Sequence, residues 1–221
     1  MFKEKIISSG IEPIGREQLL IMAEKMEKCL CLIYTDNGSR CSGFFCKIPL
    51  KNNHEFIPVL ITVNRLISEH YLKKNNNIHI SLNNGNVTKN INLNNRKVYT
   101  NKQYDITIVE IKPQQDNIND FLELDQKIFD NHFPEMFMES SIYLLHYPRA
   151  DSSKVSLGII KRINEGKIEH TCSSESGSGG GPLLFLGNSK VIGVHCGTLE
   201  MKNVKVGNLL NNSIIEFQKL F

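Results

Sequence analysis

Hydrophobic residues near the start of the chain recur every three to four positions. Residues 16 to 28 place Leu19, Met22, Ala23 and Met26 at this spacing, with charged residues between them. An apolar face at helical periodicity is the pattern of an amphipathic helix. The sequence therefore predicts an N-terminal helix that leads directly into the first β-strand.

Short apolar segments rich in Ile, Val, Phe and Tyr then alternate with polar turns. Such runs predict β-strands, and many of them in one chain predict a barrel or a sandwich. A looser stretch near 113 to 138 separates two sets of segments, so we expect two all-β halves. The predicted strands are 29–34, 43–48, 59–62, 77–82 and 105–111, followed by 141–147, 154–163, 167–171, 182–186 and 190–196.

The end of the chain returns to helical spacing. Leu210, Ile214, Phe217 and Phe221 are three or four residues apart, which predicts a closing C-terminal helix on the second half. The Asn-rich stretch from 75 to 95 is predicted to be a long polar hairpin, because Asn favours turns. The expected organisation is a helical lead-in (1–28), a first β-barrel (29–115), a linker (116–138), a second β-barrel (139–207) and a C-terminal helix (208–221).

Composition limits the possible functions. With 40% hydrophobic and 22% charged residues among 221, the chain can bury a sizeable core, so we expect a folded protein. Lys plus Arg number 26 and Asp plus Glu 23, without a dense run of like charge, so no nucleic-acid partner is expected. No apolar stretch approaches the roughly 20 residues of a membrane span, and the first residues lack the apolar core of a signal peptide. We therefore expect a cytoplasmic protein without a membrane partner.

Six cysteines, at 29, 31, 41, 46, 172 and 196, would then lie in a reducing compartment. Structural disulfides are rare there, so the prediction is six free thiols. Cys41 and Cys46 have a spacing that could hold zinc, but apolar strands surround them and free Cys is a common core residue. We expect neither a metal nor a cofactor.

Residues 171 to 197 are the most informative segment, because a Ser/Gly-rich turn precedes Pro182 and two strands follow. This turn combines with VIGVHCG (191–197), GFFCKI (43–48) and VLITVNRLI (59–67). The set resembles the trypsin-like (chymotrypsin-fold) serine peptidases, particularly the glutamyl-endopeptidase branch, and by motif order the likeness spans residues 29 to 217. The resemblance implies two packed six-stranded β-barrels with the active site in the cleft between them.

The catalytic triad of that family is incomplete in this chain. The reaction needs a hydroxyl nucleophile, an imidazole base and a carboxylate that orients the imidazole. By motif alignment Asp105 matches the carboxylate, whereas Arg65 stands at the histidine position and Gly179 at the serine position. Arg has no acceptor and Gly no side chain, and losing either member costs on the order of 10⁶-fold in turnover. The resemblance therefore implies a catalytically inactive homologue, a pseudoprotease that acts by binding.

An active serine endopeptidase with an irregular triad is the alternative. Ser178 lies one residue before the nucleophile position and would need a base from another strand. A lone His on an apolar strand is more often a hydrogen-bonded structural residue than a base. The candidate bases are His54, His70, His79, His132, His146, His170 and His195.

The resemblance also assigns binding elements. The backbone amides of Gly177 and Gly179 would form the family's oxyanion pocket, and His195 with Ser173 would form a specificity pocket for an acidic side chain. The expected partner is a protein or peptide. With the histidine gone, the buried carboxylate of Asp105 needs a new partner, so we expect an ion pair with Arg65, with a solvent-exposed Arg65 as the alternative.

Overall fold

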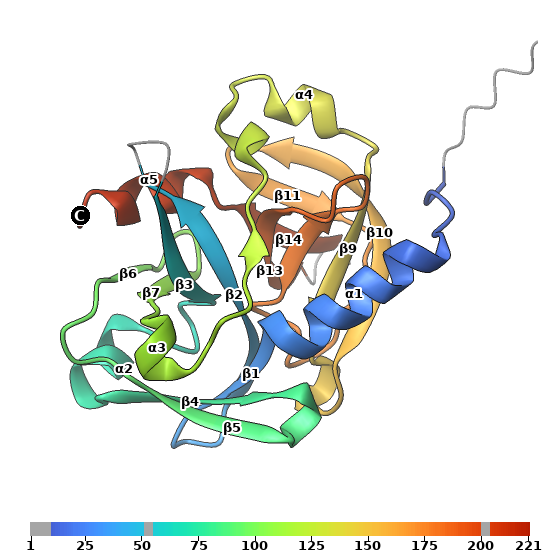
Figure 1. The fold of residues 1–221 in the computed structure, drawn as a ribbon. Helices are drawn as coiled ribbons and strands as arrows, with labels where there is room; N and C mark the ends of the chain where they lie inside the picture. Colours follow the sequence, from blue (N-terminus) through green and yellow to red (C-terminus); the bar gives the residue numbers. More distant parts are fainter. Residues whose placement is uncertain (1–9, 51–54, 200–203) are drawn as a thin grey trace, which may run out of the picture.

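The computed structural model describes residues 10–50, 55–199 and 204–221, in which two β-sheets lie side by side (Figure 1). The strands of the first sheet follow the order β5-β4-β1-β2-β3-β7-β6, and β8 pairs in parallel with β2. They are β1 (Leu30–Tyr34), β2 (Arg40–Pro49), β3 (Phe56–Thr62), β4 (Asn77–Leu82), β5 (Val87–Asn92), β6 (Val98–Asn101), β7 (Ile106–Glu110) and β8 (Leu122–Glu123).

The second sheet is a closed barrel in the order β10-β11-β14-β13-β12-β9. The first sheet is open, because its edge strands β5 and β6 are joined by the turn 93–97 and not by a hydrogen-bonded ladder. The chain thus combines a barrel with a half-barrel. The barrel strands are β9 (Ser141–His146), β10 (Lys154–Asn164), β11 (Lys167–His170), β12 (Pro182–Phe185), β13 (Val191–Leu199) and β14 (Val204–Leu209).

Helix α1 (Arg16–Cys29) lies across both halves. It packs on β1, β2 and β4 of the first sheet and on β10 of the barrel, and Lys25 donates to the carbonyl oxygen of Ser189 at 3.1 Å. Its buried face differs from the predicted one: Met22 and Cys29 are buried, whereas Leu19 and Ala23 face solvent. The apolar spacing predicted the helix, but the packing partners determine which of its faces is covered.

The C-terminal helix α5 (Asn211–Gln218) buries Leu210, Ile214 and Phe217 as expected, while Phe221 is exposed. Its predicted position on the second half is wrong, because α5 packs against β6 of the first sheet (Figure 1). Gln218 there donates to the carbonyl oxygen of Pro49 at 2.5 Å.

The remaining helical segments are short. None of the helices among the described residues is long and apolar enough to span a membrane. The predicted domain limits stay a prediction. The short segments are α2 (Glu69–Lys74), α3 (Pro113–Asp116), α4 (Phe133–Phe137) and the 3₁₀ turns η1 (Asn83–Gly85), η2 (Gln126–Phe129) and η3 (Pro148–Ala150).

One hydrophobic core spans the two halves. Phe44 and Ile61 of the first sheet belong to the same buried cluster as Leu144 and Leu183 of the barrel. Alternate residues of the first sheet, such as Phe45, face a second cluster on its other side, as the two-residue period of a strand requires. The two halves therefore hold each other in a fixed position.

A buried ion pair, which the sequence analysis missed, closes the corner between β5 and β6. The guanidinium of Arg96 makes two hydrogen bonds of 2.6 Å to the carboxylate of Asp116, and both side chains are almost fully buried. Arg96 also donates to the carbonyl oxygens of Asn92 and Glu110. These hydrogen bonds satisfy the buried guanidinium of Arg96 at the bend between β5 and β6, where the first sheet is open.

Replacing Arg96 by Ala should lower the free energy of unfolding by about 3 to 5 kcal/mol, because it leaves the Asp116 carboxylate buried and unpaired. Urea unfolding with a constant m-value measures this loss. Lys161→Ala, which removes an exposed pair with Glu139, is the control and should cost less than about 1 kcal/mol. Equal losses in the two variants would contradict the interpretation.

Candidate functional site

The glycine-rich turn is tied to the first sheet through Ser42 of β2. Both the backbone N–H and the hydroxyl of Ser42 donate to the carbonyl oxygen of Gly177, each at 2.9 Å. The same hydroxyl accepts from the N–H of Tyr147, which follows β9, at 2.9 Å. Ser42 is fully buried, so these bonds fix the turn between the two halves without competition from water.

Two glycines of this turn are required by close packing. Gly180 has φ +86, and a Cβ there would lie 2.7 Å from Thr62 Oγ1 and closer still to the carbonyl oxygen of Ser42. Gly177 has φ +87, and its Cβ would lie 2.6 Å from backbone atoms of Tyr147 and Ala150. Only glycine combines a left-handed backbone with so close an approach.

Arg65 follows the end of β3 and bridges the halves. Its backbone N–H donates to Asp105 Oδ1 at 2.9 Å, and its Nη1 donates to Asp105 Oδ2. Its Nη2 donates to the carbonyl oxygen of Cys196 in β13. The predicted Arg65–Asp105 pair is therefore confirmed. The pair is only partly buried, since the Arg65 side chain is 49% exposed, so its expected contribution to stability is about 1 kcal/mol at most.

The guanidinium also occupies the space beside Gly179. A Cβ at Gly179 would overlap Nη2 of Arg65, which leaves no room for a side chain while Arg65 keeps this conformation. The Arg65 guanidinium thus fills the space that a side chain at residue 179 would need. Arg65 and Gly179 fit each other sterically.

Asp105 is placed by an unusual backbone, with φ +45, directly before β7. Burial raises the pKa of its carboxyl group, and the neighbouring Arg65 opposes this rise. Its hydrogen-bond partners are the backbone N–H and the guanidinium of Arg65. The carboxylate therefore neutralises a cation where the family would orient an imidazole.

Ser178 is paired with a histidine inside the protein. Its hydroxyl lies 2.7 Å from Nδ1 of His146, and Nε2 of His146 lies 2.9 Å from the hydroxyl of Ser156. The N–H of Glu175 also donates to Ser178 Oγ, at 3.0 Å. Ser178 is fully buried and His146 is 2% exposed, so this pair is closed to a substrate.

The residues predicted to form a specificity pocket differ in exposure. Ser173 is exposed, whereas His195 is 1% exposed and lies 3.1 Å, ring nitrogen to ring nitrogen, from buried His170. The N–H of Cys172 donates to His170 Nδ1, so the proton of neutral His170 lies on Nε2 and points to His195 Nδ1. The pocket stays a prediction.

Of the other candidate bases, His70, His79 and His132 are exposed. His54 lies outside the described residues. The structure therefore identifies His146 as the histidine beside Ser178. The sequence could not identify it, because 32 residues separate the two in the chain.

The backbone amides of the predicted oxyanion pocket differ from those of the neighbouring residues in their hydrogen bonds. Ser178 N–H donates to Glu175 O, and the amides of Gly180 and Gly181 donate to His195 O and Ser178 O. Within the described part of the chain, the N–H groups of Gly177 and Gly179 donate to no acceptor. Two free donors thus remain on the turn.

The cysteines near the site are unsuited to nucleophilic attack. All six are free, and burial raises the pKa of the Cys196 thiol to about 12, with Asp105 adding to the rise. Burial also raises the pKa of Cys41. A neutral thiol is a poor nucleophile, so neither replaces the missing serine. The described residues contain no cluster of three His, Cys, Asp or Glu side chains that could hold a metal.

Solved serine proteases have the same fold as this chain at low sequence identity. A serine endoprotease from Yersinia pestis matches over 94% of this chain and 67% of its own, with a TM-score of 0.66 and 13% identity. Deg5 matches over 92% and 95%, with a TM-score of 0.64 and 16% identity. An inactive mutant of Rv3671c from M. tuberculosis H37Rv matches over 96% and 95%, with a TM-score of 0.62 and 14% identity.

The chain has the trypsin-like serine protease fold. The predicted fold class, an all-β barrel pair with helices at both ends, is thereby confirmed, with the first barrel open. No protein-family model and no curated protein matches the sequence. At sequence identities of 13 to 16%, these matches show the fold and nothing finer. The glutamyl-endopeptidase branch and the loss of catalysis stay predictions.

Acid should destabilise this fold through its buried histidines. Burial lowers the pKa of His146 and of His170 to about 4 and that of His195 well below 6.5. The unfolded chain binds these protons near pH 6.5, so the free energy of unfolding should fall as the pH drops from 6.5 to about 4. His170 alone should account for about 3 kcal/mol.

Urea unfolding across this pH window measures the effect. His170→Gln should reduce the slope of stability against pH, whereas the exposed His70→Gln should leave it unchanged. A slope that is equal in wild type and His170→Gln would show that this histidine does not drive the acid sensitivity.

Proposed function

We propose that the chain is a catalytically inactive homologue of trypsin-like serine proteases whose cleft binds a protein or peptide segment. One observation carries the proposal: the guanidinium of Arg65 fills the space beside Gly179 while it pairs with Asp105. A permanently charged donor there can neither accept a proton nor attack a carbonyl group.

Binding without hydrolysis is supported by hydrogen-bond donors on the glycine turn and by Arg65 beside it. The amides of Gly177 and Gly179 are free, and half of the Arg65 side chain is exposed beside them. Amide N–H groups and a guanidinium favour a carbonyl or carboxylate oxygen. We therefore propose as ligand a peptide whose C-terminal carboxylate lies against the glycine turn.

The second candidate is an active endopeptidase that uses Ser178 with His146 as its base. The 2.7 Å contact between their side chains favours it. Complete burial of Ser178 and the absence of a carboxylate behind the imidazole, where Ser156 lies, argue against it. We rank this activity second.

We further propose that the protein works in the cytoplasm, or another reducing compartment, without a metal or cofactor. Six free cysteines, four of which are at most 5% exposed, support a reducing environment. Neither nucleic acid nor a membrane is a proposed partner, for the reasons of charge and hydropathy given above.

A fluorophosphonate probe should leave the wild-type chain unlabelled, because it reacts only with an activated serine. Mass spectrometry of the treated protein reads the result. Labelling of Ser178 that is lost in His146→Gln would establish the second candidate instead. The double variant Arg65→His with Gly179→Ser is the complementary test, since recovered labelling would show that only the triad residues had been lost.

Peptides with a free C-terminal carboxylate should bind better than the same peptides with a C-terminal amide. Arg65→Gln removes the charge and leaves a shorter polar side chain, and should weaken this binding about tenfold or more. Fluorescence polarisation with paired peptides measures the ratio. Equal affinities for acid and amide would exclude carboxylate recognition at the turn.

A further inference from the structure

A groove crosses the face of the molecule on which the linker runs between the two halves. Two cavities, of about 250 and 510 Å³, share Pro49, Phe56 and Gln126 and so form one continuous depression. The first extends to Lys190 and Glu123, and the second extends to α5. We call this depression the linker groove.

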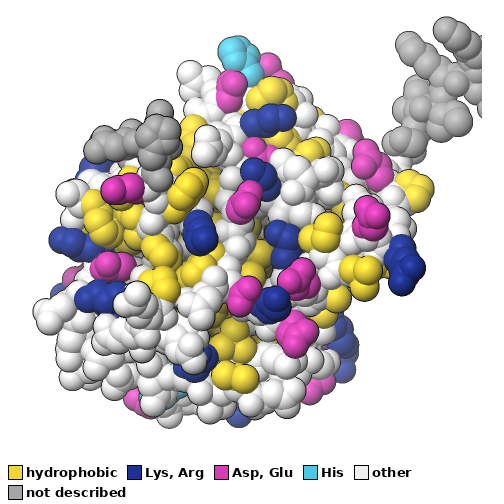
Figure 2. Space-filling view, viewed as in Figure 1, with side chains coloured by type: hydrophobic (Ala, Val, Ile, Leu, Met, Phe, Trp, Pro, Cys, Tyr) yellow, Lys and Arg dark blue, Asp and Glu magenta, His cyan; other side chains and the backbone are white. Residues whose placement is uncertain are grey.

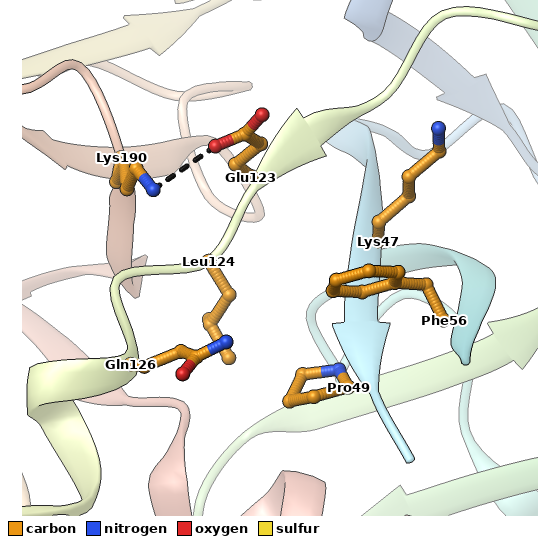
Figure 3. A pocket seen from close by; sticks show the side chains of 7 residues that line it. All are labelled: Lys47, Pro49, Phe56, Glu123, Leu124, Gln126 and Lys190. Carbon is orange, nitrogen blue, oxygen red and sulfur yellow. Dashed lines mark ion pairs between the residues drawn. The ribbon is translucent and has the colours of Figure 1, made fainter. Parts of the chain in front are cut away.

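The linker groove is formed by all main parts of the fold. Lys47, Pro49 and Phe56 come from the β2–β3 hairpin and lie on one side (Figure 3). Leu124 and Gln126 of the linker face them (Figure 3). The elements that carry these side chains contribute to one shared core.

Large apolar side chains line the linker groove and face solvent. Phe56 is 54% exposed, Phe129 36% and Ile215 39%. Further along the same strand as Phe56, Val59 and Leu60 are fully buried. Hydrophobic side chains gather on this face with single charges between them (Figure 2). Exposed apolar residues that line a depression mark a binding surface more often than scattered ones do.

The charges at one end of the groove favour an acidic ligand. Lys190 is paired with Glu123 at 3.0 Å, whereas Lys47 has no carboxylate within 4.0 Å among the described residues. The Lys47 ammonium lies 5.7 Å from the centre of the Phe121 ring and is otherwise exposed. Two cations and one carboxylate leave this end with an unpaired positive charge.

The linker groove is separate from the cleft of the proposed function. Phe56 opens β3, and Arg65 follows the other end of that seven-residue strand. A strand of this length spans roughly 20 Å, so the groove and the Arg65 site lie at opposite ends of it. A ligand in one therefore does not contact the other.

We propose that the linker groove binds a short segment of a partner protein that carries at least two large apolar side chains and a carboxylate. The apolar side chains pack on Phe56, Phe129 and Ile215, and the carboxylate pairs with Lys47. A peptide fits better than a lipid surface, because both signs of charge and two amides, Gln126 and Gln218, rim the groove. Apolar anchors in a groove with one charge contact are a common mode of peptide recognition.

The test is a selection of displayed random peptides on the immobilised full chain, followed by affinity measurement with the enriched peptide. Enriched sequences should contain large apolar residues together with Asp or Glu. Phe56→Ser should weaken binding about tenfold or more, because one large apolar contact is lost. Val87→Ser, which changes an exposed apolar residue of β5 outside the groove, and Arg65→Gln should leave the affinity unchanged.

A charge exchange tests the proposed orientation. Lys47→Glu should weaken binding of the acidic peptide, and replacing the acidic residue of the peptide by Lys should restore it. Enriched peptides that bind Phe56→Ser as tightly as wild type would overturn the proposal, as would enrichment of basic peptides. Self-association in ultracentrifugation, or flotation with anionic vesicles, that Phe56→Ser abolishes would assign the groove to a second copy or a membrane and would overturn it as well.

Discussion

The backbone of the glycine turn lies against β2 so closely that no side chain fits between them. Gly180 meets the carbonyl oxygen of Ser42, and Gly177 accepts two hydrogen bonds from the same residue. Because Ser42 also binds the backbone N–H of Tyr147, one buried hydroxyl holds the barrel, the half-barrel and the turn together. The position of every group in the cleft follows from this contact.

Arg65 depends on that geometry, because its guanidinium reaches both halves only when the turn lies where it does. It donates to Asp105 on the first sheet and to Cys196 O on the barrel, and it fills the space beside Gly179. The Arg65 side chain and the absence of a side chain at Gly179 compensate each other in volume. The result is a bridge of hydrogen bonds between the two halves.

The sequence predicted the strands and helices whose apolar pattern is strong. It did not predict features that depend on tertiary packing. The polar hairpin predicted over 75–95 is confirmed as the antiparallel pair of β4 and β5, whereas β14 was missed because Lys and Asn interrupt its apolar residues. The Arg65–Asp105 pair was predictable from motif order and the energy of an unpaired carboxylate. Neither Arg96–Asp116 nor Ser178–His146 was, because nothing in local sequence joins residues 20 and 32 positions apart.

The close packing of the glycine turn also limits what the glycine motif can show about function. Gly177 and Gly180 are demanded by contacts with Ser42, Tyr147 and Ala150, and these contacts exist whether or not a nucleophile stands at 179. The fold therefore requires these glycines whatever the activity of the chain. The glycine motif is therefore evidence of the fold. The function has to be inferred from groups that the fold does not require. These are the half-exposed guanidinium of Arg65, the two free amides beside it, and the exposed Phe56 at the far end of β3.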